Sequence, residues 1–423
     1  MKMGIIKYPK QEEWKNILAR PVIDSSVIEE KVSVILKEVK QNGDSALKNY
    51  SLSFGDYWGD VTEKNIYASE KKISNELKSA ILLAKKNIER FHFSQKEKIK
   101  VVETVKGVKC WRKSVAIEKV GLYIPGGSAP LFSTILMLGI PARIAGCKEI
   151  ILCTPSRNGE INPAVLYAAK IVGIKKIFKV GGGQAIAAMA YGTETIPKVS
   201  KIFGPGNQYV TCAKQLVQKD GVAIDMPAGP SEVAVLADKS CVPAFVASDL
   251  LSQAEHGADS QVILVSDDEK VIKEVQNEIL VQLEELPRKE IAAKALQNSK
   301  AILVKNKNEA MQLLNEYAPE HLILSCRGAD KLAAQVVNAG SVFLGNYSPE
   351  SAGDYASGTN HTLPTNGYAN AYSGVSLDSF MKKITFQKLS KEGLRKIGPA
   401  VERMAEAEGL LAHKNAVSQR IKN

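Results

Sequence analysis

The residues best able to do chemistry are histidines that stand beside carboxylates and amides. The chain has only five histidines. One of them ends a run in which Asp249, Gln253 and His256 recur at helical spacing. That spacing places the three side chains on one face of a helix. Because histidine changes charge near physiological pH, it serves as a proton carrier or a metal ligand, and the pattern favours an enzyme.

A metal site is the first chemical possibility. Gln253 and His256 lie one helical turn apart, just before Gly257, and the opposite face of this helix is apolar. The polar face is therefore free to point into a cleft. A donor set without thiolate suits a hard or borderline divalent ion, with zinc, manganese and cobalt all possible. Asp354, in a glycine-flanked loop, and His413, near the carboxyl terminus, bring the expected ligands to four, although spacing alone does not show that they converge.

An acid–base pair is the second possibility. Glu320 and His321 follow Pro319 and precede an apolar run. At a turn both side chains can reach one cleft, where a histidine can take a hydroxyl proton and a partly buried glutamate can deprotonate a water. The alternative is a capping carboxylate beside a hydrogen-bonded histidine. His92 lies beside the apolar stripe of a predicted helix over 73–91, and we expect it to be an ordinary surface or boundary residue.

Short apolar runs alternate with helical segments from about residue 119, and they predict the elements that position these side chains. The expected strands form two series, 120–125, 150–153, 176–180 and 201–203, then 233–236, 262–265, 301–304, 322–324 and 341–344. Helices such as 268–284 and 307–317 separate several of them. An earlier helix over 28–39 is expected to stop at 42–44. This alternation indicates parallel sheets with covered faces.

The predicted fold class is therefore α/β, with two incomplete, Rossmann-like parallel-sheet domains and small helical segments at both ends. The expected division begins with an N-terminal segment, 1–20. A larger domain of 21–118 and 229–375 would carry the metal and acid–base residues, and 119–228 would form the second domain. The tail, 376–423, is expected to be helical and too small for a core of its own.

Glycine-rich turns follow several predicted strands, at 125–128, 180–185 and 203–207. Glycine lets backbone N–H groups approach an anionic ligand. The spacing is not the dinucleotide fingerprint, because Ile186 stands where the third glycine after Gly181 is required. The turns predict a ligand at the carboxyl ends of strands, with plain tight turns as the alternative.

Composition argues against several classes of protein. The chain has 423 residues and 45% hydrophobic content, enough for real cores. It contains no signal-peptide core and no apolar run near the roughly 18 residues that span a bilayer. Six cysteines without paired spacing indicate reduced thiols, so we expect a cytoplasmic protein without membrane attachment. The net charge of +11 is spread over helical faces without aromatic residues between, which argues against nucleic acid.

Long strings of this chain closely resemble the histidinol dehydrogenase family, in order from roughly residue 20 to the end. They are 204–210, 225–232, 249–257, 318–322, 351–361 and 408–416. The resemblance implies oxidation of L-histidinol through histidinal to L-histidine, with two NAD and one water consumed. It also implies an intertwined homodimer, in which the tail of one subunit completes the site of its partner.

The resemblance assigns roles residue by residue. It implies that one Zn²⁺ per subunit is bound by Gln253, His256, Asp354 and His413. The catalytic pair matches Glu320 and His321. The substrate contacts match the four metal ligands together with Ser231, His321, His361 and Glu408. The NAD contacts match Tyr123, Gln184 and Asn207.

Three other functions stay open at this point. A metallohydrolase could use a similar ligand set, since a glutamate beside zinc also hydrolyses amides or esters. A basic nucleic-acid or scaffold protein that has lost catalysis would show decayed site residues, and none is seen. A paralogous zinc- and NAD-dependent dehydrogenase could oxidise another amino or sulfonated alcohol. Intact Ser231, His361 and Glu408 favour histidinol.

Overall fold

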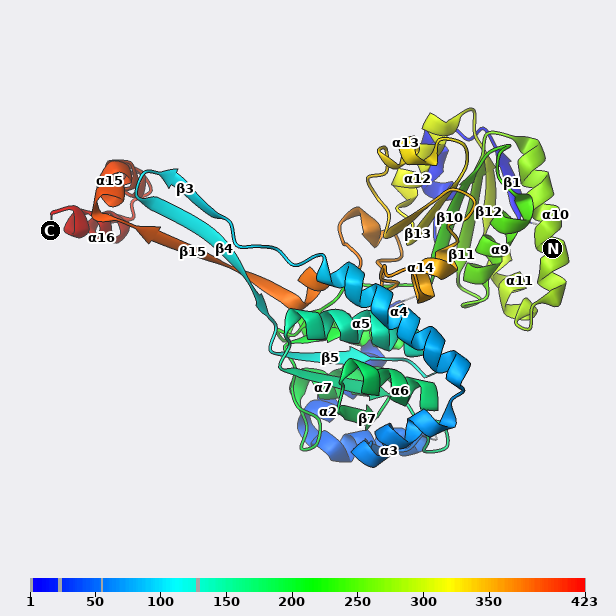
Figure 1. Ribbon diagram of the computed structural model, residues 1–423, viewed down its shortest axis with the longest axis horizontal. Helices are drawn as coiled ribbons and strands as arrows, with labels where there is room; N and C mark the ends of the chain where they lie inside the picture. Colours follow the sequence, from blue (N-terminus) through cyan, green and yellow to red (C-terminus); the bar gives the residue numbers. More distant parts are fainter. Residues whose placement is uncertain (1–2, 22–24, 55, 127–129, 423) are drawn as a thin grey trace.

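The computed structural model describes residues 3–21, 25–54, 56–126 and 130–422. Two six-stranded sheets lie side by side, each with helices on both faces, and a long antiparallel arm extends from one of them (Figure 1). The predicted α/β class with parallel sheets is confirmed. No helix in the described ranges has the length and apolar character needed to cross a bilayer.

The first sheet is entirely parallel, in the order β1-β12-β11-β10-β13-β14. Its strands are β1 (Gly4–Lys7), β10 (Glu232–Ala237), β11 (Gln261–Ser266), β12 (Lys300–Leu303), β13 (His321–Ser325) and β14 (Ser341–Leu344). The central strands read as continuous apolar runs because both of their faces are buried. The N-terminal segment thus supplies an edge strand.

Helices fill a core on each face of this first sheet. On one face pack α9 (Pro243–Ala254), α10 (Glu269–Glu285) and α11 (Lys289–Gln297). On the other face pack α1 (Gln11–Ile17), α12 (Lys307–Tyr317) and α13 (Ala329–Ala333). The short helices α14 (Glu350–Tyr355), η2 (Tyr368–Asn370) and η3 (Leu377–Phe380) follow β14.

The second sheet has the order β2-β7-β6-β5-β8-β9 and is parallel except for β2. Its strands are β2 (Gly59–Asp60), β5 (Lys119–Tyr123), β6 (Glu149–Thr154), β7 (Lys176–Lys179), β8 (Lys201–Phe203) and β9 (Ala223–Ile224). The helices that supply its two cores are α4 (Asn75–Phe93), α5 (Phe132–Ala145) and α6 (Pro163–Val172), then α2 (Ser25–Ser53), α7 (Gly182–Tyr191) and α8 (Gln208–Gln218). Two short helices, α3 (Glu63–Ala68) and η1 (Ser69–Lys72), lie beside α6.

The expected placement of 21–118 with the site-bearing sheet is wrong. Helix α2 packs on α7 and α8, and α4 packs on α5, so both helices cover the second sheet. Their buried residues, such as Val32 and Ile88, belong to its two cores. Periodicity predicted the helices but could not select a sheet, because an apolar stripe fits any complementary face. Gly43, at φ 51°, interrupts α2 where the helix was expected to stop.

An arm made of β3 (Val101–Val105), β4 (Val108–Ala116) and β15 (Met381–Leu389) corrects the expectation of a wholly helical tail. β15 pairs antiparallel with β4 over nine residues. Its lysine-rich, largely exposed sequence shows no clear alternation, and its partner lies far away in the chain. The helices α15 (Lys391–Ala407) and α16 (Leu411–Lys422) follow, at the end of the arm that is remote from the first sheet (Figure 1).

Candidate active site

A cavity of about 1060 Å³ lies where loops of the two sheets meet. Five of the sequence-predicted site residues line it, namely Asn207, Ser231, His256, Glu320 and His361. Asn207 follows β8 of the second sheet, whereas Ser231 and Glu320 directly precede β10 and β13 of the first. The second sheet therefore presents the carboxyl ends of its strands to this region, and the first sheet presents amino ends.

The pairing of β10 with β13 assembles the predicted acid–base pair. The register aligns His321 with Val233, which brings Glu232 beside Glu320. The Glu232 N–H donates to the Glu320 carboxylate at 2.9 Å, and His321 Nδ1 lies 3.3 Å from the Glu232 carbonyl oxygen. Both predicted residues are buried. The turn before β13 thus directs adjacent side chains to one centre, as the sequence suggested.

Both members of this pair have strongly shifted pKa values. Burial raises the pKa of Glu320 to about 8, although the neighbouring His321 opposes the rise. Burial lowers the pKa of His321, but the surrounding carboxylates of Glu320, Asp354 and Glu350 outweigh it and raise that pKa to about 10. Buried, mutually coupled acids and bases of this kind are typical of proton-transfer sites.

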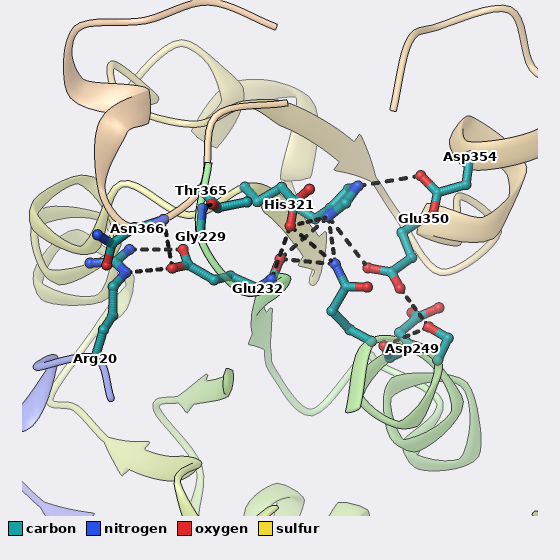
Figure 2. A network of polar contacts seen from close by, with 12 residues as sticks. Arg20, Gly229, Glu232, Asp249, His321, Glu350, Asp354, Thr365 and Asn366 are labelled. Carbon is teal, nitrogen blue, oxygen red and sulfur yellow. Dashed lines mark hydrogen bonds and ion pairs between the residues drawn. The ribbon is translucent and has the colours of Figure 1, made fainter. Parts of the chain in front are cut away.

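Three of the four expected metal ligands gather around His321. Gln253 Nε2 lies 2.9 Å from His321 Nδ1 and donates to the Glu232 carbonyl at 3.2 Å. Asp354 Oδ1 lies 3.3 Å from His321 Nε2 (Figure 2). Burial lowers the pKa of His256, and the nearby Asp354 carboxylate acts in the opposite direction.

The oxygens of Gln253 and Asp354 pass a direct test for a cation site. Gln253 Oε1 and Asp354 Oδ1 are buried and have no hydrogen-bond partner. Buried oxygens are normally satisfied, so the unpaired Gln253 Oε1 fits a cation, and Asp354 Oδ1, which is ion-paired with His321 Nε2 at 3.3 Å, adds negative charge at the same histidine. Among the described residues no three His, Cys, Asp or Glu side chains form a metal-holding group by themselves. The expected ligands on this part of the chain are one amide, Gln253, and two side chains of these types, His256 and Asp354.

Glu350, the first residue of α14, also lies at this site and was not predicted from the sequence. It is 1% exposed, and its Oε2, which has no hydrogen-bond partner, lies 4.0 Å from His321 Nδ1. Its other oxygen accepts a hydrogen bond from Ser252 Oγ at 2.6 Å. Burial raises the pKa of Glu350 to about 7. A usable signal was present, because Glu350 precedes Asp354 by four residues, the spacing of one helix face.

His361 is held by both halves of the molecule. Its Nε2 lies 3.0 Å from Thr134 Oγ1 of α5, and its Nδ1 lies 2.8 Å from the Asp354 carbonyl oxygen. The expectation for His92 is wrong, because α4 packs beneath the loop that carries His361. His92 is fully buried, with Nε2 3.3 Å from the side-chain amide of Asn360. The His92 side chain thus helps to fix the loop that carries His361.

The three expected NAD contacts lie at carboxyl ends of the second sheet. Tyr123 ends β5, and its hydroxyl accepts a hydrogen bond from the Gly182 N–H at 3.1 Å. Gln184, in the first turn of α7, is buried. Asn207 caps α8, since its Oδ1 accepts from two N–H groups of the first turn at 3.1 Å. Of these three, Asn207 lines the cavity.

The turn before Asn207 requires glycine. Gly204 has a φ of 126°, and a Cβ there would lie 2.0 Å from the Tyr123 carbonyl oxygen. Of the expected turns, 125–128 falls partly outside the described residues, which omit 127–129.

Two predicted site residues, Glu408 and His413, lie far from the cavity in this chain. Glu408 directly follows α15 as its C-cap, His413 lies in α16, and both are exposed. These helices lie at the far end of the arm, whereas β10 and β13 lie on the opposite side of the molecule (Figure 1). Within one chain the four expected metal ligands therefore share no common centre.

Comparisons with a family model, with related sequences and with solved structures all lead to the same family. The family model of histidinol dehydrogenase matches residues 18–421. Histidinol dehydrogenase from Bacteroides thetaiotaomicron is 61% identical over 423 residues, 99% of either chain. That from Pectobacterium atrosepticum is 52% identical over 416 residues, 97% of this chain and 93% of the relative. The crystal structure of histidinol dehydrogenase from Elizabethkingia anophelis, at 56% identity, superimposes with a TM-score of 0.97 and covers 99% and 98% of the two chains.

Proposed function

The chain belongs to the histidinol dehydrogenase family, and from that premise we propose which of its residues carry out the reaction. Its activity is the NAD-dependent oxidation of L-histidinol in histidine biosynthesis. The observation that carries the assignment is the contact of the buried Glu320–His321 pair with Gln253 and Asp354, whose amide and carboxylate oxygens fit a cation.

Gln253, His256 and Asp354 would hold one Zn²⁺ per subunit, with His413 as the fourth ligand. A nitrogen and oxygen donor set without thiolate suits zinc in a site that keeps room for substrate. When bound, the ion supplies positive charge that fixes a chelating amino alcohol and polarises its oxygen. Ser231, His361 and Glu408 would contact the same substrate.

His321 takes the first proton. It accepts the hydroxyl proton of histidinol as hydride leaves the substrate carbon for NAD, which gives an aldehyde. The ring must be neutral to do so, although three carboxylates raise its pKa in the free chain. Asp354 is one of these carboxylates and also an expected metal ligand, so a cation held there would weaken its pull on the His321 proton. NAD would lie along Tyr123, Gln184 and Asn207.

Glu320 serves the second oxidation. Its raised pKa makes the carboxylate basic enough to deprotonate a water that adds to the aldehyde. The protonated His321 returns its proton to the oxygen of the adduct, which gives the hydrate, and it accepts a proton again as the hydrate transfers hydride to a second NAD. Each turnover consumes two NAD and one water. Because the site is buried, the reactive aldehyde stays enclosed between the two steps.

Two variants separate these roles when histidinol and histidinal are each supplied as substrate. We expect His321→Asn to lose both oxidations, because this residue acts as base in each. Glu320→Gln is expected to retain the first oxidation and lose the second. The measurement is NADH formation with each substrate. If Glu320→Gln made histidine from histidinol at the normal rate while His321→Asn did not, the assignment of Glu320 would be wrong.

We further propose a homodimer in which the partner's tail delivers Glu408 and His413. Large exposed apolar side chains gather on the arm and its helices, as expected of a surface that meets another chain. They include Val101, Val102, Ile384, Phe386, Met404, Leu410 and Leu411. The free state of all six cysteines fits a cytoplasmic location, which is also part of the proposal.

Hybrid dimers test this exchange. Gln253→Ala and His413→Ala each damage the expected ligand set, but in different parts of the chain. If tails are exchanged, a hybrid of the two variants has one intact site and one doubly damaged site. Random mixing should then restore about one quarter of the wild-type activity, since half of the dimers are hybrids with half of their sites intact. Mixtures that stay as inactive as either variant would exclude exchange.

A further inference from the structure

We propose that Arg20 is a positioning residue for the acid–base pair and that it acts through Glu232. The inference rests on the proposed roles of Glu320 and His321. Arg20 lies between α1 and α2, far from both residues in the chain, and no sequence pattern singled it out. Figure 2 shows it on one side of Glu232, with His321 on the other side.

Arg20 grips the side chain of Glu232 with two parallel hydrogen bonds. Nε donates to Glu232 Oε1 at 2.5 Å, and Nη2 donates to Oε2 at 2.9 Å. The guanidinium is itself fixed, because Nη2 donates to the Tyr317 carbonyl at 2.6 Å and Cζ lies 4.1 Å from the centre of the Tyr317 ring. The backbone N–H of Asn366 adds a further bond to Glu232 Oε1 at 2.8 Å. The carboxylate is therefore held by three hydrogen bonds from two residues.

The backbone of the same residue contacts the chemistry. The Glu232 N–H donates to the Glu320 carboxylate at 2.9 Å. Its carbonyl oxygen accepts from Gln253 Nε2 at 3.2 Å and faces His321 Nδ1 at 3.3 Å. A shift of this one residue would therefore move the acid–base pair and an expected metal ligand together. Displacements near 1 Å in a catalytic site can lower a rate about 100-fold.

Because Arg20 and Glu232 are largely buried, loss of the guanidinium should affect the site and not only the surface. The Glu232 side chain is 3% exposed, and that of Arg20 is 17% exposed. Without the guanidinium, a buried carboxylate would be left without its cation beside Glu320, and it would have to move toward water. A lysine keeps the charge but cannot reproduce the two parallel bonds. A purely structural role would instead predict lower stability with unchanged chemistry in the folded fraction.

The test uses the full-length enzyme with Arg20→Met, Arg20→Lys and Glu232→Gln. Lys7→Met is the matched control, because Lys7 is also an N-terminal cation bonded to a carboxylate, Glu269, but at the surface. Each variant is checked for cooperative thermal unfolding, and kcat and KM are measured with histidinol and with histidinal. Should Arg20→Met fail to fold, Arg20→Lys, which keeps the charge, and Glu232→Gln, which keeps the shape, carry the test.

We expect Arg20→Met to lower kcat about tenfold or more with both substrates, because one residue contacts both members of the pair. Arg20→Lys should lie between wild type and Arg20→Met. In Arg20→Met and Arg20→Lys, the KM for NAD should stay within about twofold of the wild-type value. Lys7→Met should have wild-type kcat and KM. In the Glu232→Gln background, Arg20→Met should have no further effect on kcat. A kcat within about threefold of wild type for Arg20→Met, or effects of the two substitutions that multiply, would overturn the proposal.

Glu320→Gln and His321→Asn are measured alongside to keep two failures apart. If those variants retain both oxidations, the proposed function fails, whatever Arg20 does. If they lose activity as expected and the Arg20 variants do not, the inference about Arg20 alone is wrong.

Discussion

The ion pair of Lys214 and Asp225 gives a prediction whose size follows from burial. Lys214 Nζ lies 2.5 Å from Asp225 Oδ1, and the two side chains are 4% and 1% exposed. Nζ also donates to the Gly204 carbonyl at 2.8 Å, and the Gly204 N–H donates to Asp225 Oδ2 at 2.8 Å. The pair therefore holds both polar groups of Gly204, at the start of the turn that carries Asn207.

Lys214→Met leaves the Asp225 carboxylate buried without a cation. Breaking a buried pair by removing one partner costs about 3–5 kcal/mol. At roughly 2–4 °C per kcal/mol for a domain of this size, the Tm should fall by about 10 °C. The turn should also loosen, so that the KM for NAD rises while the KM for histidinol stays near the wild-type value. Thermal unfolding followed by circular dichroism, together with steady-state kinetics, measures both effects.

Lys176→Met is the control for this prediction. Lys176 contacts Glu149 at the same 2.5 Å, on neighbouring strands of the second sheet, but its side chain is 53% exposed. An exposed pair contributes about 0–1 kcal/mol, so the Tm should fall by no more than a few degrees. The double variant with Met at 214 and Asn at 225 should be more stable than Lys214→Met. Equal losses for Lys214→Met and Lys176→Met would refute the reasoning from burial.

The remaining predictions concern pH, backbone strain and metal binding. Burial raises the pKa of Asp249 to about 7, so its carboxyl group favours the fold at low pH and this contribution is lost as pH rises from about 4 to 7. Relative to wild type, Asp249→Asn should gain up to about 4 kcal/mol between pH 4 and pH 8 in urea unfolding, and parallel pH curves would contradict this. Gly204→Ala should destabilise the protein by about 3 kcal/mol in the same assay, because its Cβ would meet the Tyr123 carbonyl oxygen at a positive φ; wild-type stability would disprove the clash. Deletion from about residue 400 should abolish zinc binding in metal analysis, and full zinc content would rule out a ligand in the tail.

Most strands could be predicted from the sequence because of how parallel sheets are buried. Strands such as β10 and β11 are covered on both faces, so they read as unbroken apolar runs between polar or glycine turns. β15 was missed for the converse reason. It is largely exposed and rich in lysine, and it is a strand because β4 lies beside it. That pairing joins distant parts of the chain, which local patterns do not record.

The candidate site was predictable where chemistry and local spacing coincide. The turn before Glu320 brings that side chain to the cavity, and Gln253 on α9 contacts His321. The expected helix face is wrong for His256, because α9 ends at Ala254 and His256 reaches the cavity from the turn that follows. Glu350, Thr134 and Arg20 were missed because their roles depend on neighbours from other elements. The sequence around an arginine in a loop does not indicate which carboxylate it will pair with in the fold.

The order of the strands in the first sheet has a consequence during synthesis on the ribosome. Every strand of the second sheet lies before residue 225, so that sheet can close while the chain is still emerging. β1 is made first, yet it pairs with β12, residues 300–303. β1 therefore lacks its hydrogen-bonding partner through most of translation, and during that time its edge is open to association with other nascent chains.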